Sequence, residues 1–159
     1  MKNLFKILFT CCLFPFLISC LTQKEKEENK KLIVKIVKSN NFKFVAQQAI
    51  PLRMSPQQLT SEYSLIISPD SINCYLPYFG VATQVPYGST DMGIQFTTTK
   101  FSYDKNTKSD GSYEILIIPK ETDKATKLFL QISENGFASL KVLSNNRDPI
   151  TFDGSIEKR

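Results

Sequence analysis

The chain has 159 residues, a length typical of a single domain. It contains no histidine, which excludes Ser-His-Asp triads, Cys-His pairs and histidine metal ligands. Its hydrophobic content of 42% is typical of a globular protein. The net charge of +5 arises in the N-terminal part, because from Lys43 onward 12 basic residues balance 12 acidic ones. Nucleic-acid binding requires a basic face on the folded domain, so we expect no nucleic-acid partner.

The first residues have the pattern of a secretory signal peptide, with lysines before a short apolar run from Ile7 to Ile18. That run is shorter than the roughly 20 apolar residues of a membrane-spanning helix. It ends in Leu17-Ile18-Ser19-Cys20, which resembles the lipobox of bacterial lipoproteins. The resemblance implies cleavage before Cys20 and lipid on this residue. We therefore expect a signal peptide over 1–19, a lipid-anchored N-terminus over 20–22 and one domain over 23–159; the alternative is an ordinary signal peptide.

Processing of this kind decides the roles of the four cysteines. Cys11 and Cys12 would leave with the signal peptide and Cys20 would carry lipid, so Cys74 would remain as a single thiol without a disulfide partner. Without a histidine to lower its pKa, we expect Cys74 to be structural and buried. Leu21 after the lipidated position favours the outer membrane of a gram-negative cell envelope, in the common sorting logic.

Residues 23–39 have the apolar spacing of one amphipathic helix. Thr22 and Glu25 form a capping box at its start, and Asn40 is a typical residue for its end. Lysines surround an apolar stripe that consists of Leu32, Ile33, Ile36 and Val37. We expect this stripe to pack on a sheet while the lysines are solvated; the alternative is that the lysines face a membrane surface.

After Asn41 the apolar period changes from 3.6 to 2, which indicates strands. Hairpin signals stand at Asp110-Gly111 and Asn135-Gly136, and a change of parity between Thr98 and Phe101 predicts a bulge or bend. Strands are expected around residues 42–46, 63–67, 72–76, 92–103, 112–119, 125–133, 137–144 and 149–157. The predicted fold is mainly β: one N-terminal amphipathic helix followed by about eight antiparallel strands in a curved sheet or barrel-like, lipocalin-like domain.

Several local strings stand in a distinctive order along the chain. They are Asn41-Phe42-Lys43-Phe44-Val45-Ala46, Ser61-Glu62-Tyr63-Ser64-Leu65, Cys74-Tyr75-Leu76-Pro77-Tyr78-Phe79-Gly80, Val85-Pro86-Tyr87-Gly88, Asn135-Gly136-Phe137-Ala138-Ser139-Leu140, Ser144-Asn145-Asn146-Arg147 and Ile150-Thr151-Phe152-Asp153-Gly154. Together they resemble the domain of unknown function family 4251 over most of the chain. The resemblance implies a small lipoprotein of an anaerobic gram-negative bacterium and implies no activity. The loop 87–91 departs from it in having fewer glycines.

Two segments supply candidate binding residues. An aromatic segment punctuated by proline and glycine either forms an exposed binding surface or closes one end of the core. Next to two asparagines in a tight connection, Arg147 has the fork geometry to bind a carboxylate or phosphate; we expect it instead to pair internally, with an acid or with carbonyl groups. The candidate surface consists of Tyr75, Tyr78, Phe79, Tyr87, Asn145, Asn146 and Arg147.

The sequence contains no catalytic motif, metal-ligand cluster or phosphate-binding loop, so we predict no catalytic residue, metal or cofactor. The favoured function is a non-enzymatic binding or interaction module, held at the membrane through Cys20, with an envelope protein or small ligand as partner. One alternative is a carrier of a small apolar ligand in a barrel cavity. Another is a histidine-free hydrolase that uses carboxylates of raised pKa.

Overall fold

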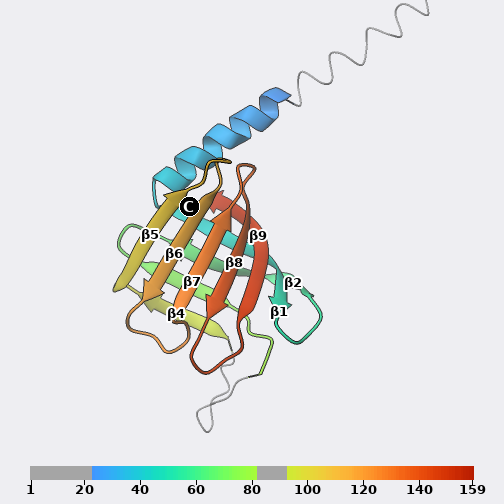
Figure 1. The fold of residues 1–159 in the computed structure, drawn as a ribbon, viewed down its shortest axis with the longest axis vertical. Coiled ribbons are helices and arrows are strands. Elements are labelled where there is room, and N and C mark those ends of the chain that lie inside the picture. Colours follow the sequence, from blue (N-terminus) through green and yellow to red (C-terminus); the bar gives the residue numbers. More distant parts are fainter. Residues whose placement is uncertain (1–22, 82–92) are drawn as a thin grey trace, which may run out of the picture.

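The computed structural model of the chain describes residues 23–81 and 93–159. A helix over residues 23–38 precedes nine strands (Figure 1). The strands are β1 (Phe42–Pro51), β2 (Gln57–Ile67), β3 (Ile72–Leu76), β4 (Ile94–Thr98), β5 (Phe101–Thr107), β6 (Tyr113–Pro119), β7 (Lys127–Ile132), β8 (Phe137–Leu143) and β9 (Ile150–Lys158). In the described part of the chain, no helix is long and apolar enough to cross a bilayer.

The nine strands form one antiparallel sheet in the order β4-β3-β2-β1-β9-β8-β7-β6-β5. The sheet curls on itself, so that β5 to β9 form one wall and the remaining strands run behind it (Figure 1). The predicted class is confirmed: one N-terminal helix and a nearly closed, barrel-like antiparallel sheet. The number of strands differs from the prediction because the expected strand over 92–103 is divided. There, the Thr98 hydroxyl accepts a hydrogen bond from the Lys100 amide at 3.1 Å and turns the chain between β4 and β5.

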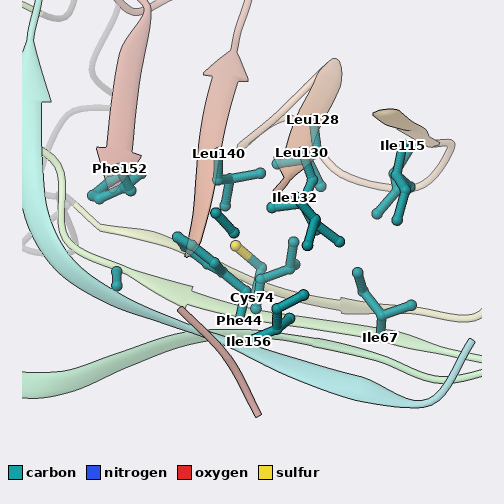
Figure 2. Packing of buried hydrophobic residues seen from close by; sticks show 14 of the residues in the cluster. Phe44, Ile67, Cys74, Ile115, Leu128, Leu130, Ile132, Leu140, Phe152 and Ile156 are labelled. Atoms are coloured by element: carbon teal, nitrogen blue, oxygen red, sulfur yellow. The ribbon is translucent and has the colours of Figure 1, made fainter. Parts of the chain in front are cut away.

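Alternating apolar residues fill the interior of the barrel. Phe44 and Cys74 point toward side chains such as Leu130 and Leu140 on the facing wall (Figure 2). These four side chains are buried and belong to one continuous core cluster. Burial raises the pKa of the Cys74 thiol well above its ordinary value, so this thiol stays protonated. Its place in the core confirms the expectation of a buried cysteine.

A bulge shapes the centre of the sheet, where β1 pairs with β9. The register shifts between Ala46 and Gln48 on β1, opposite Gly154 on β9. A Cβ atom at Gly154 would collide with the carbonyl oxygen of Val45, so only glycine fits this close approach of two backbones. Glycines also hold the two predicted hairpins, Gly111 with φ 79° and Gly136 with φ 87°.

The helix closes the upper end of the barrel in Figure 1. Its residues Ile33, Ile36 and Val37 are buried in the core, as predicted for the apolar stripe, whereas Leu32 of the same stripe is exposed. The turn that follows the helix contains Asn40, which adopts φ 51°. Lys105 of β5 then donates hydrogen bonds to the Val37 carbonyl at 3.0 Å and to Asn40 Oδ1 at 2.7 Å. A charged side chain on the inner face therefore fixes the last turn of the helix to an edge strand.

Candidate functional site

Two segments that the sequence singled out meet at the lower end of the barrel, away from the helix (Figure 1). Tyr78 follows β3, and Arg147 lies in the connection from β8 to β9. The Arg147 guanidinium carbon lies 5.1 Å from the centroid of the Tyr78 ring, within the range of a cation–π interaction. The Tyr78 hydroxyl lies 2.9 Å from the Val81 carbonyl and 3.2 Å from the Asp148 carbonyl, and it donates to both.

Arginine contacts extend this cluster to two further parts of the chain. Arg147 Nη1 donates to the carbonyl of Gly93, just before β4, at 3.0 Å. Arg53, in the turn between β1 and β2, places Nε 3.1 Å from Asp148 Oδ2. This contact is an ion pair without hydrogen-bond geometry, and Asp148 Oδ2 accepts no hydrogen bond from the described residues. We call Arg53, Tyr78, Arg147 and Asp148 the distal cluster.

From the sequence, Arg147 is expected to pair internally, with an acid or with carbonyl groups. Arg147 does donate to a carbonyl group, Gly93 O. Asp148, one of the acids considered as its partner, instead forms its ion pair with Arg53. The Asp148 amide also donates to the Val81 carbonyl at 3.1 Å. The cluster therefore joins three connections that are far apart in the sequence.

The electrostatics of the distal cluster keep Tyr78 neutral. Burial, reinforced by the negative charge of Asp148, raises the pKa of Tyr78 above its ordinary value. The hydroxyl consequently remains protonated at neutral pH and remains a hydrogen-bond donor to the two carbonyl groups. Through these hydrogen bonds Tyr78 joins the connection after β3 to the connection between β8 and β9.

Three exposed apolar side chains surround the distal cluster. Leu52 and Met54 flank Arg53 in the turn after β1, with 62% and 52% of their surface exposed. Val81, whose carbonyl accepts from Tyr78 and Asp148, is 53% exposed. We call Leu52, Met54 and Val81 the distal surface. Exposed apolar side chains grouped on fixed loops are typical of interaction sites.

The structure separates the other predicted surface residues. Tyr75 is 46% exposed and stacks on Tyr63, with ring centroids 5.6 Å apart, instead of joining Tyr78. Tyr78 and Phe79 are half-buried, so the expectation that both are largely buried was too strong. Asn145 is exposed and Asn146 is half-buried in the connection that carries Arg147. Tyr87 and Cys20 lie outside the described residues.

Residues missed by the sequence analysis lie mainly in the turn after β1. Arg53, Leu52 and Met54 follow the buried Pro51 and show no periodicity or motif. Their one available signal is composition: three long side chains, two of them apolar, stand where a turn normally has small polar residues. An unusual turn composition of this kind could have marked the segment as a surface that does more than connect strands.

The alternatives of hydrolase and carrier were also compared with the structure. Among the described residues, no group of three or more metal-ligating side chains comes together. Three described carboxyl groups have a pKa that is lowered from its ordinary value. Lys43 lowers the pKa of Glu62, and hydrogen bonds from Ser112 lower the pKa of Asp110. Lys108 lowers the pKa of Glu114. A groove of about 590 Å³ lies on the outside of β7 to β9 beside Phe129 and Lys141. The described residues that face the interior of the barrel include one continuous cluster of buried apolar side chains.

Both the sequence and the fold of this chain are similar to those of a known protein family. The model of a domain of unknown function, DUF4251, matches residues 24–156. The chain belongs to this family. Its fold is similar to the crystal structure of a DUF4251 family protein from Bacteroides eggerthii DSM 20697, with a TM-score of 0.59 and 16% identity. The similarity covers 82% of this chain and 87% of that one. No curated protein matches the chain.

Proposed function

We propose that this protein is a non-enzymatic interaction module of the cell envelope, which binds a partner protein through the distal surface. The observation that carries this proposal is the distal cluster itself. It fixes the backbone next to Leu52, Met54 and Val81, while these side chains stay exposed. Ordering loops before binding lowers the entropy cost of association, and exposed apolar groups on such loops supply the affinity.

The chemistry of the surface indicates the kind of partner. Apolar contacts from Leu52, Met54 and Val81 suit a partner with its own apolar centre. Arg53 lies between two of them and keeps 67% of its side chain exposed despite its ion pair. A carboxylate at the rim of the partner surface would complement this guanidinium. A filled barrel supports this function over that of an apolar-ligand carrier.

Membrane attachment through Cys20 would orient the distal surface. Two residues separate Cys20 from residue 23, where the helix begins, so the helix would start within roughly 11 Å of the lipidated residue. The helix lies at one end of the barrel and the distal cluster at the other (Figure 1). An anchored protein of this shape, with the outer membrane as the favoured location, would present the distal surface away from its own membrane.

A site-specific photo-crosslinker tests the interaction. Placed at Met54 in cells, it should form an adduct with one partner protein, and Leu52→Asp should abolish the adduct. The matched control is the crosslinker at Phe137, which is equally apolar and 57% exposed but lies in the hairpin beneath the helix. Equal adducts at both positions, or an adduct that survives Leu52→Asp, would refute the distal surface as the binding site.

Labelling with a fatty acid tests the anchor separately. Cys20→Ser should prevent incorporation of radioactive fatty acid and release the protein from membranes, because no thiol remains to carry lipid. Cys12→Ser, in the same apolar run, is the control and should change neither property. Labelling of the Cys20→Ser protein at the normal level would show that Cys20 is not lipidated.

A further inference from the structure

A small groove at the helix end collects positive charge. It has a volume of about 230 Å³ and lies between the helix and the end of β9. The charged side chains that line it are all cationic, and no Asp or Glu side chain among the described residues lines it. It is lined by Leu32, Lys35, Ile36, Ser39, Asn41, Lys158 and Arg159. We call it the basic groove.

The positive charge of the basic groove is held in place by the fold. Arg159 donates from Nη1 to the hydroxyl of Ser68, which belongs to the turn between β2 and β3. A guanidinium has five N–H donors, so this bond positions the group and leaves donors for an anion. Lys35 and Lys158 are exposed on the two sides of the groove. The cations thus come from the helix and from the end of β9, and the turn between β2 and β3 positions Arg159.

Further lysines strengthen the potential around the groove. Lys105, below the last turn of the helix, has its pKa lowered by burial and by the nearby positive charge of Lys38. Six lysines oppose three glutamates over residues 24–38. The acids closest in sequence to the two ends of the set of groove residues, Glu28 and Glu157, do not line the groove. Accumulated charge of one sign attracts anionic surfaces and falls off within a Debye length.

An apolar side chain completes the surface. Leu32 is 49% exposed although it follows the apolar period of the helix, and it stands beside Lys35 in the groove. An exposed leucine among lysines on a helix is the arrangement of peripheral membrane helices, in which apolar groups enter the interface and cations meet lipid phosphates. The helix also begins three residues after Cys20, so this end would be the one held at the bilayer.

We infer that the basic groove docks onto the phosphate headgroups of anionic lipids in the membrane that carries the protein. Lys35, Lys158 and Arg159 contact the phosphates and Leu32 enters the interface. Because it assigns the helix end to the membrane side, this inference rests on the anchoring proposed for Cys20. Two attachments, one by acyl chains and one by the groove, would hold the barrel in one orientation, which a single attachment at Cys20 would not.

Lysine footprinting on the mature protein tests this docking. The protein is mixed with vesicles of phosphatidylcholine alone, or of phosphatidylcholine with phosphatidylglycerol, and its lysines are acetylated with a membrane-impermeant reagent. Mass spectrometry should show Lys35 and Lys158 labelled about fivefold more slowly on the anionic vesicles, the factor expected for about 1 kcal/mol per lysine. Added salt should remove the difference. Lys127 and Lys141, exposed on the barrel wall, are internal controls and should label equally on both.

Charge reversal shows whether the groove acts as one site. Lys158→Glu should largely abolish the protection of Lys35, whereas Lys141→Glu, the same change on the barrel wall, should leave it intact. Equal labelling of Lys35 on both vesicles, or equal protection of Lys127 and Lys141, would overturn the inference. The comparison is between two bilayers that accept acyl chains equally, so a failure here is distinct from a failure of the anchor at Cys20.

Discussion

At the helix end the barrel is closed by buried apolar side chains, Ile33, Ile36 and Val37, whereas at the other end Tyr78, Arg147 and Asp148 join the loops through polar and cation–π contacts. The first closure gains stability from apolar area removed from water. The second depends on a few directional contacts, each of which contributes little net stability. It leaves apolar groups exposed around it. One end is thus closed by apolar packing, and the other by directional contacts that leave apolar side chains exposed.

The largest effect is expected when the apolar closure is broken. Ile36→Ala should lower the free energy of unfolding by about 2–5 kcal/mol, because it leaves a cavity between the helix and the sheet. Denaturant titration measures this loss. Leu32→Ala on the same helix is the matched control, and its cost should stay near 0.5 kcal/mol because Leu32 is half exposed. Equal losses for both variants would mean that the helix does not plug the barrel.

A smaller loss is expected at the distal cluster. Arg147→Lys keeps the charge but removes the planar fork over the Tyr78 ring, so it should cost about 1–2 kcal/mol in the same titration. Arg53→Lys is the control: Arg53 is 67% exposed and the change keeps a positive charge beside Asp148, so it should cost under about 1 kcal/mol. If Arg147→Lys leaves stability unchanged while it abolishes the crosslink at Met54, the main role of Arg147 is contact with the partner.

The smallest effect concerns alkaline pH at the helix end. Tyr103 donates to Asn40 Oδ1 at 3.3 Å, and burial raises the pKa of Tyr103 to about 12. The folded state therefore keeps a proton that the unfolded chain loses near its ordinary pKa of about 10. This contribution to stability is complete below about pH 10 and is lost as the pH rises toward 12. Stability curves of the wild type and Tyr103→Phe should differ in this window; parallel curves would contradict the burial of Tyr103.

The contrast between the two ends also explains which features the sequence predicts. The apolar stripe at Ile33, Ile36 and Val37 and the hairpin signals at Asp110-Gly111 and Asn135-Gly136 are local patterns, so the helix and most strands could be placed. In the sequence, the division of the expected strand over 92–103 into β4 and β5 is indicated only by a change in the alternation of apolar residues between Thr98 and Phe101. Strand order was not predictable, because pairing such as β1 with β9 joins distant residues.

The candidate site was less predictable than the fold. Tyr78 and Arg147 were singled out for composition, but nothing in their spacing shows that one lies over the other. Arg53 reaches Asp148 only because β1 and β9 are neighbours in the sheet. The strand order of the sheet brings the residues of this cluster together. No shared motif or spacing in the sequence links them. The stacking of Tyr75 on Tyr63 instead of Tyr78 has the same origin, since β2 and β3 are paired.

The inward-pointing Lys105 also affects an edge of the sheet. β5 is an edge strand, and an edge strand offers its backbone groups to any strand of another molecule. The Lys105 ammonium donates hydrogen bonds to the Val37 carbonyl and to Asn40 Oδ1, so a strand that added to this edge and flattened it would leave a charge without these partners. The lysine that fixes the last turn of the helix therefore also disfavours the addition of a strand from another molecule to β5.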